Sequence, residues 1–219
     1  MKLGMENFLQ KKIFTSNIND IVSVLKKGGL AVFPTDTLYG ILANAFDKNS
    51  VEYLYKIKQR KPEKPYLILI KDLSSLEPFK VVISEKEKKL LEYKGITVIL
   101  DINEKDKFNY LHRGINSLAF RIPKEGIILQ LLEKLNFPVV APSVNPEGKP
   151  PARNIKEAYK YFKNSIDIYF DYGEIYNKKP STIVKIQKDK PVIIREGSTS
   201  LEDIKKLLNK NRVSNNNRV

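Results

Sequence analysis

The sequence predicts an α/β fold, a single domain in which helices flank a twisted, open, mixed sheet around a concave pocket. Apolar runs of strand length alternate along the chain with amphipathic segments of helix length. Strands crowd together towards the C-terminal end, which favours a mixed sheet over a purely parallel one. Polar residues follow several of the strands, where open α/β sheets usually bind their ligands.

Caps and glycines define the first elements. A helix is predicted over residues 17–27, because an asparagine opens it and Gly28-Gly29 ends it. The apolar run 30–33 is predicted as a buried strand, and residues 50–59 as a second helix. One face of that helix carries Val51, Leu54, Tyr55 and Lys58.

The remaining chain continues the alternation. Strands are predicted at residues 66–70, 96–100, 118–122, 139–141, 168–170, 182–186 and 192–194. Helices are predicted at residues 85–93, 127–135, 154–162 and 200–208. Asn154 and Glu157 are spaced like a capping box. Residues 8–208 are assigned to one domain, and the polar segment 209–219 is predicted to be disordered because it has nothing to bury.

The composition excludes several classes of protein. The chain has 219 residues, no cysteine and one histidine, His112. A disulfide framework and a thiolate metal site are therefore excluded, and a zinc cage is disfavoured. No apolar run approaches the roughly 18 residues that span a membrane, and the N-terminus lacks the apolar stretch of a signal peptide. We expect a cytoplasmic protein with no membrane partner and no metal site of its own.

The net charge of +14 has two explanations. Of the 39 basic residues 32 are lysine and 7 are arginine, which is the usage expected from an AT-rich genome. The alternative is a surface that faces nucleic acid. The arginines are more informative because they are scarce, and Arg60, Arg121 and Arg195 each lie beside a polar motif.

Two polar motifs follow the first strand and the second helix. Residues 34–37, Pro-Thr-Asp-Thr, leave a buried strand and form either a turn or a pocket wall. Residues 58–65, Lys-Gln-Arg-Lys-Pro-Glu-Lys-Pro, place four cations at a helix end, where the helix dipole alone would favour them. The two prolines stiffen this loop, so Arg60 and Lys64 could also clamp a triphosphate. No Gly-rich phosphate loop is present.

Two further motifs lie later in the chain. Residues 141–151 form either a proline-rich surface loop or a ligand loop, and Ser143 and Asn145 alternate so that both can face one side. Residues 181–184 and 193–197 are predicted as adjacent strands, one opening with hydroxyls and the other ending in Arg195. Arg121, inside an apolar strand, needs a partner, and an anionic ligand is one candidate.

These motifs together resemble a known family. The stretches PTDTLYG, KQR, SLAFRIP, APSVNPEGKPP, PSTIVKI and IIREG occur in the order found in YrdC-type L-threonylcarbamoyladenylate synthases. The resemblance covers residues 25–197. It implies formation of threonylcarbamoyl-AMP and pyrophosphate from L-threonine, bicarbonate or CO2, and ATP with Mg²⁺. It also implies a partner complex that transfers the threonylcarbamoyl group to adenosine 37 of tRNA, and weak binding of double-stranded RNA. The extra C-terminal domain of longer relatives is expected to be absent.

The same resemblance assigns roles to individual residues. It implies that Lys58 and Arg60 are catalytic. Threonine would be held by Thr35, Arg121, Ala141 and Thr182. ATP would be held by Arg60, Lys64, Thr97, Ser143, Asn145, Pro151 and Arg195.

Three alternatives remain open. One is a non-catalytic RNA-binding protein of this fold, although the aromatic motifs of RNA-binding modules are missing. Another is a carbamoyltransferase like the YrdC-like domain of hydrogenase-maturation proteins, which the absence of cysteine disfavours because those proteins carry zinc fingers. The third is a relative with a different substrate.

Overall fold

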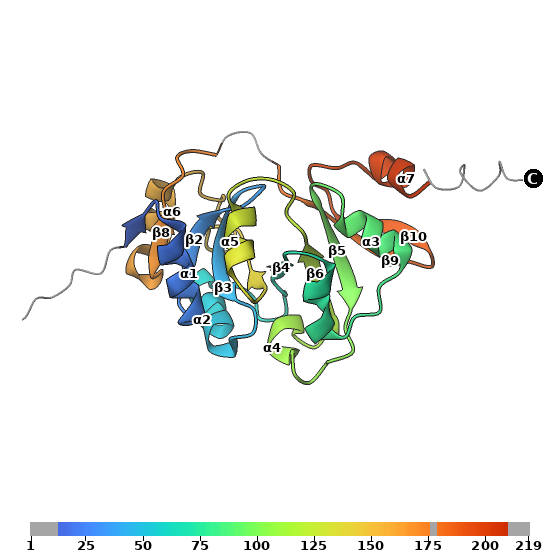
Figure 1. Ribbon diagram of the computed structural model, residues 1–219, viewed down its shortest axis with the longest axis horizontal. Coiled ribbons are helices and arrows are strands. Elements are labelled where there is room, and N and C mark those ends of the chain that lie inside the picture. Colours follow the sequence, from blue (N-terminus) through green and yellow to red (C-terminus); the bar gives the residue numbers. More distant parts are fainter. Residues whose placement is uncertain (1–12, 176–178, 210–219) are drawn as a thin grey trace, which may run out of the picture.

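One ten-stranded sheet runs through the residues that the structure, a computed structural model, describes: 13–175 and 179–209 (Figure 1). In spatial order its strands are β1 (Phe14–Thr15), β8 (Ile168–Phe170), β2 (Ala31–Pro34), β3 (Tyr39–Asn44), β7 (Val139–Val140), β4 (Leu67–Leu69), β6 (Ser117–Arg121), β5 (Ile96–Asp101), β9 (Thr182–Gln187) and β10 (Lys190–Arg195). The strand β6 pairs parallel with β4 and antiparallel with β5. The predicted α/β class with an open mixed sheet is confirmed.

Helices cover both faces of this sheet. They are α1 (Ile18–Lys26), α2 (Lys48–Lys58), α3 (Glu85–Leu91), α4 (Asn109–His112), α5 (Ile128–Lys134), α6 (Ile155–Phe162) and α7 (Leu201–Asn209), with short 3₁₀ turns η1 (Leu73–Phe79) and η2 (Lys163–Ser165). Helices α1 and α5 pack on one face over a core cluster that includes Ile21, Leu25 and Leu131. The other helices pack on the opposite face over a larger cluster. No helix in the described ranges is long and apolar enough to cross a bilayer.

Several elements were not predicted from the sequence. The most important is β3, which pairs antiparallel with β2 and is buried along five of its six residues. A strand buried on both faces shows no alternation of polar and apolar residues, so it is hard to recognise. The short β1, α4, η1 and η2 were missed as well. The segment predicted to be disordered lies outside the described residues, except for Asn209, which ends α7.

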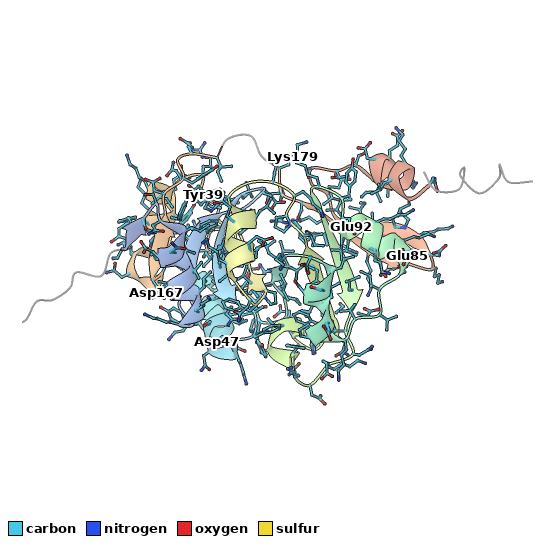
Figure 2. All side chains as sticks on the ribbon, viewed as in Figure 1. Tyr39, Asp47, Glu85, Glu92, Asp167 and Lys179 are labelled. Atoms are coloured by element: carbon cyan, nitrogen blue, oxygen red, sulfur yellow. The ribbon has the colours of Figure 1, made fainter. Side chains whose placement is uncertain are left out.

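The helix starts follow from side-chain caps. Asp47 accepts hydrogen bonds from the backbone N–H groups of Asn49 and Ser50, so α2 begins two residues earlier than predicted (Figure 2). Asn154 caps α6 as expected by accepting from the Glu157 N–H. The Glu157 carboxylate accepts instead from the backbone N–H of Arg153, so the predicted capping box is only half formed.

The sheet face under α1 and α5 leads into a cavity. The core cluster on that face reaches β4 at Leu69. Leu67, two residues earlier on the same face, lies opposite Ala119 of β6, and both residues line the cavity. Helices α1 and α5 therefore cover this face of the sheet as far as β4, and the uncovered part around Leu67 and Ala119 forms the floor of the cavity.

Gly197 allows the segment after β10 to cross the backbone that enters β9. A Cβ at this position would lie 2.4 Å from the carbonyl oxygen of Pro180 and 2.5 Å from the backbone nitrogen of Thr182. Backbone atoms cannot rotate aside, so Gly197→Ala should lower the free energy of unfolding by roughly 1–3 kcal/mol. Urea denaturation measures this difference. Glu196→Ala, at an exposed neighbour, is the control, and equal midpoints for the two variants would contradict the prediction.

Candidate active site

A cavity of about 470 Å³ lies where the sheet face is uncovered. This volume is in the range of small-molecule sites. Six separate segments line it, and five of them overlap the polar motifs found in the sequence. The lining residues used below are Thr35, Gly40, Arg60, Tyr66, Ala119, Arg121, Ala141, Ser143, Pro151, Ser181, Ile183 and Arg195.

A buried ion pair forms the deep end of the cavity. The Arg121 Nη2 lies 2.8 Å from the Asp36 Oδ1, and the two side chains are 4% and 3% exposed. Burial lowers the pKa of Arg121, and the charge of Asp36 opposes that shift. The Arg121 Nε has no hydrogen-bond partner among the described residues. Asp36 was not named as a site residue from the sequence, although it lies in the Pro-Thr-Asp-Thr motif.

Thr35 lies in the turn between β2 and β3. Its hydroxyl donates to the carbonyl of Leu38 at 2.6 Å and accepts weakly from the backbone N–H of Thr37 and of Leu38. The turn interpretation of this motif is therefore correct, and the residue also lines the cavity. Thr35 therefore belongs both to a turn and to a pocket wall, because its hydroxyl bonds within the turn while the residue lines the cavity.

Gly40 lets two backbones approach next to this turn. A Cβ at Gly40 would lie 3.2 Å from the Thr35 Cγ2 and 3.5 Å from the Pro142 carbonyl oxygen. Gly40 also forms an isolated bridge with Ser143. The proline-rich loop is held against β3 at this point, since the Ile41 N–H donates to the carbonyl of Pro142 and the Val144 N–H donates to the carbonyl of Tyr39.

Tyr39 anchors a further segment beside the cavity (Figure 2). Its hydroxyl donates to the carbonyl of Gly173 at 2.8 Å and accepts from the N–H of Tyr172. Burial raises the pKa of Tyr39 to about 12, so the phenol stays protonated at neutral pH. The chain after β8 is thus tied to β3.

Ser181 connects three of the predicted site residues. Its hydroxyl lies 2.7 Å from the Thr97 hydroxyl and accepts from Arg121 at 3.2 Å. Arg195 donates to the Ser181 carbonyl at 2.8 Å. Sequence reasoning noticed Ser181 in its motif but left it out of the site. Thr97 is fully buried and lies behind Ser181, outside the cavity lining.

Thr182 lies on the opposite side of β9 from the cavity. Its neighbours Ser181 and Ile183 line the cavity, whereas Thr182 does not. The Thr182 hydroxyl donates to the carbonyl of Thr199 at 2.6 Å and accepts from the Thr199 N–H. The predicted threonine contact of this side chain therefore has no support in the geometry, and Ser181 takes the cavity-facing place.

Arg60 and Arg195 form the cationic mouth of the cavity. Among the described residues no ion pair joins either guanidinium to a carboxylate: Arg60 donates to the carbonyls of Lys64 and Pro65, and Arg195 to Ser181. Burial lowers the pKa of Arg195, and the nearby charge of Arg60 adds to the effect. Two mutually repelling cations at one opening favour an anionic ligand.

Lys58 points away from the cavity, into the proline-rich loop. It is 3% exposed, and its Nζ donates to the carbonyls of Ser143, at 2.6 Å, and of Asn145. It also lies 5.9 Å from the centroid of the Phe162 ring. The structure thus places Lys58 as a clamp on this loop, not among the lining residues.

Within the loop, Ser143 and Asn145 bond to each other. The Ser143 hydroxyl donates to the Asn145 Oδ1 at 2.6 Å, and the Asn145 amide donates to the carbonyls of Pro146 and Lys149. The two side chains therefore meet, as their alternation suggested, but each already has a structural partner. Ala141 and Pro151 line the cavity at the two ends of the loop.

Lys64 lies outside the cavity lining. It forms an ion pair at 2.6 Å with Glu147, whose other oxygen accepts from the backbone N–H of Lys61. This carboxylate joins the cationic loop to the proline-rich loop. A role for Lys64 in phosphate binding would require it to leave Glu147.

The residues present do not form a metal cage. Within the described ranges no group of three or more His, Cys, Asp or Glu side chains is suitably placed for a metal ion. His112 is buried, and both of its ring nitrogens bond to backbone groups. Any Mg²⁺ at this cavity would need ligands from a bound phosphate chain.

Lys58 should make stability depend on pH. Burial, together with the charge of Arg60, lowers its pKa from 10.5 to about 7. Between those two pH values the unfolded chain holds a proton that the folded chain lacks, so the free energy of unfolding rises with pH. Relative to Lys58→Met, the wild type should gain a few kcal/mol from pH 7 to pH 10, since one pKa unit is about 1.4 kcal/mol. Urea unfolding of both proteins across this range tests it, and parallel pH profiles would refute it.

Comparison with known proteins gives a consistent family. The family model described as telomere recombination, which covers Sua5, YciO and YrdC proteins, matches residues 23–197. A threonylcarbamoyl-AMP synthase of Pyrococcus abyssi is 30% identical, over 94% of this chain and 61% of the relative. A putative threonylcarbamoyl-AMP synthase of Methanocaldococcus jannaschii is 31% identical, over 92% of this chain and 99% of the relative.

Solved structures agree with this result. The crystal structure of P. abyssi Sua5 complexed with L-threonine matches with a TM-score of 0.80 at 29% identity, over 90% of this chain and 59% of that one. Escherichia coli YciO matches with a TM-score of 0.75 at 25% identity, over 88% and 97%. This chain thus spans 61% of the P. abyssi synthase that it resembles. Because the family model covers most of its length, the chain belongs to the Sua5/YciO/YrdC family.

Proposed function

We propose that the protein is an L-threonylcarbamoyladenylate synthase, which forms threonylcarbamoyl-AMP and pyrophosphate from L-threonine, bicarbonate or CO2, and ATP. The observation that carries this proposal is the cationic mouth formed by Arg60 and Arg195, which has no carboxylate partner in the described structure. A triphosphate would supply the missing negative charge. The relatives named as threonylcarbamoyl-AMP synthases support the same conclusion.

Threonine and ATP would occupy different ends of the cavity. The deep end, with Thr35, Arg121 and Ala141, offers a hydroxyl and a buried guanidinium and suits the amino acid; the L-threonine bound by P. abyssi Sua5 supports this choice of ligand. The mouth, with Arg60, Ser143, Pro151 and Arg195, suits the nucleotide. Thr97 and Asn145 would not contact the nucleotide directly. Their hydrogen bonds would hold the side chains of Ser181 and Ser143 in place.

The chemistry needs no covalent enzyme intermediate. The threonine amine adds to CO2 and loses a proton, which gives a carbamate. A carbamate oxygen then attacks the α-phosphorus of ATP, and pyrophosphate leaves. The arginines of the mouth would offset the charge of the phosphates, and Mg²⁺ bound to the triphosphate would contribute further charge. Catalysis would therefore consist of positioning and charge stabilisation.

The product is a reactive mixed anhydride that water hydrolyses readily. A partner complex that acts on tRNA would accept it and transfer the threonylcarbamoyl group to adenosine 37. The net charge of +14 would give weak contact with the phosphates of RNA.

Pyrophosphate release tests the reaction. It should require both threonine and bicarbonate in the presence of ATP and Mg²⁺, and mass spectrometry should detect the threonylcarbamoyl adenylate. Serine should react several-fold less efficiently, because loss of one methyl from a fitted pocket costs about 1 kcal/mol. Equal turnover of serine and threonine would contradict the assigned specificity.

The pyrophosphate-release assay also distinguishes the proposed function from two alternatives. The second candidate is a member of the same family that acts on a different substrate. Pyrophosphate release with another amino acid, and none with threonine, would select that alternative. No ATP consumption, combined with tight and salt-sensitive RNA binding, would select the non-catalytic RNA-binding protein.

Arg60 should contribute strongly to ATP affinity. Arg60→Ala removes a charge-assisted phosphate contact, so the dissociation constant for ATP should rise at least tenfold, or about 1.4 kcal/mol. Isothermal titration calorimetry measures this directly. Lys61→Ala, which removes the exposed neighbouring cation, is the control and should change affinity less than threefold. Equal effects of the two substitutions would mean that only general charge matters.

A further inference from the structure

Arg113 is a partly buried cation that none of the roles above uses. It ends α4 in a left-handed conformation, with φ of 55°, and its side chain is 14% exposed. Two hydrogen bonds, at 2.9 and 3.1 Å, join its guanidinium to both carboxylate oxygens of Glu52 on α2. A bidentate pair of this kind fixes the plane of the guanidinium.

The single histidine holds the turn that carries Arg113. The His112 Nδ1 accepts from the backbone N–H groups of Gly114 and Asn116, at 3.1 and 3.3 Å. The proton therefore resides on Nε2, which donates to the carbonyl of Lys105 at 2.6 Å. Arg113 is thus held from both sides, by its own turn and by α2.

A series of ring contacts connects Arg113 to Arg60. The Arg113 Cζ lies 3.9 Å from the centroid of the Tyr55 ring, and the Tyr55 and Tyr66 centroids are 4.2 Å apart. The Arg60 Cζ lies 4.9 Å from the Tyr66 centroid. All three distances are in the range of favourable cation–π or aromatic contacts. Four planar groups therefore lie in series between α4 and the mouth of the cavity.

The two tyrosines also fix the local position of Arg60. The Tyr55 hydroxyl and the Arg60 Nε both donate to the carbonyl of Lys64, at 2.8 and 2.9 Å. The Tyr66 hydroxyl has no hydrogen-bond partner among the described residues, so its contribution is the face of its ring. Burial raises the pKa of both phenols, so the rings remain neutral.

Arg113 itself does not reach the cavity. It lines a separate surface hollow together with residues of α2, of α4 and of the basic loop, among them Glu52, Tyr110 and Pro62. The tyrosine rings are therefore the contacts through which Arg113 can act on Arg60. An arginine that is already ordered loses less conformational entropy when it binds phosphate.

We propose that Arg113 is a positioning residue for Arg60, and that the series Arg113, Tyr55, Tyr66 and Arg60 orders the cationic mouth before ATP binds. The effect on ATP rests on the proposed function. The ordering of Arg60 does not, because it is a property of the free protein.

A double-mutant cycle tests the coupling through ATP affinity. Arg113→Met should raise the dissociation constant for ATP about threefold to tenfold in the wild-type background, and should have no further effect in Arg60→Ala. Lys107→Met is the matched control, because Lys107 lies over the Phe108 ring at 5.1 Å and lines the same hollow without a contact to the series. A loss that persists undiminished in Arg60→Ala would overturn the proposal.

A second measurement does not depend on ATP. The chain has seven arginines, so the Nε–H signals in a nitrogen-15 spectrum are few, and the signal lost in Arg60→Ala identifies Arg60. Its exchange with solvent should become several-fold faster in Arg113→Met and stay unchanged in Lys107→Met. Unchanged exchange in Arg113→Met would overturn the proposal. Absence of ATP binding in the wild type, with the expected change in exchange, would refute only the proposed function.

Arg113→Lys is a milder substitution that can be used if Arg113→Met does not fold. Arg113→Lys keeps a cation beside Glu52 but removes the flat guanidinium over Tyr55. It should shift both readouts in the same direction as Arg113→Met, by a smaller factor. A folded Arg113→Lys protein with wild-type ATP affinity and wild-type exchange at Arg60 would also overturn the proposal.

Discussion

The buried ion pair between Arg121 and Asp36 is the constraint on which the site depends. Arg121 is on β6 and Asp36 follows β2, and the order of the sheet places β3, β7 and β4 between those strands. Removal of either charge would leave the other buried and unpaired, which lowers the free energy of unfolding by about 3–5 kcal/mol. The turn after β2 must therefore reach across to β6, and that reach closes the deep end of the cavity.

The same pair sets how charge is distributed along the cavity. At the deep end a guanidinium is neutralised by a carboxylate, whereas at the mouth Arg60 and Arg195 have only carbonyl and hydroxyl acceptors in the described structure. A highly charged anion therefore gains more at the mouth than at the deep end. Ser181 links the two ends, since its hydroxyl accepts from Arg121 and its carbonyl accepts from Arg195. One residue thus relates the positions that two different substrates would occupy.

The sequence was sufficient for the fold class and for most elements, because helix faces and buried runs are local signals. Four residues predicted for the site from the sequence do line one cavity: Thr35, Arg60, Ser143 and Arg195. The sequence did not separate Ser181, which lines the cavity, from Thr182, which does not, because that difference depends on a single residue of register and successive strand residues point to opposite sides. The bonding of Lys58 could not be predicted either, because its two carbonyl partners lie 85 and 87 residues further along the chain and leave no local signal.

Consecutive cations in the basic loop have different roles because of one backbone turn. Gln59 ends α2 in the left-handed conformation, with φ of 52°, so Lys58 points into the proline-rich loop while Arg60 turns to the cavity. Lysine suits the first place, where two carbonyl oxygens each accept one hydrogen bond, and arginine suits the second, where a flat guanidinium lies over the Tyr66 ring. The chain has 32 lysines and 7 arginines, and Arg60 is one of the few arginines that stand where a planar group is used. Arg113, with its bidentate carboxylate and its tyrosine ring, satisfies the same requirement, although no motif in the sequence drew attention to it.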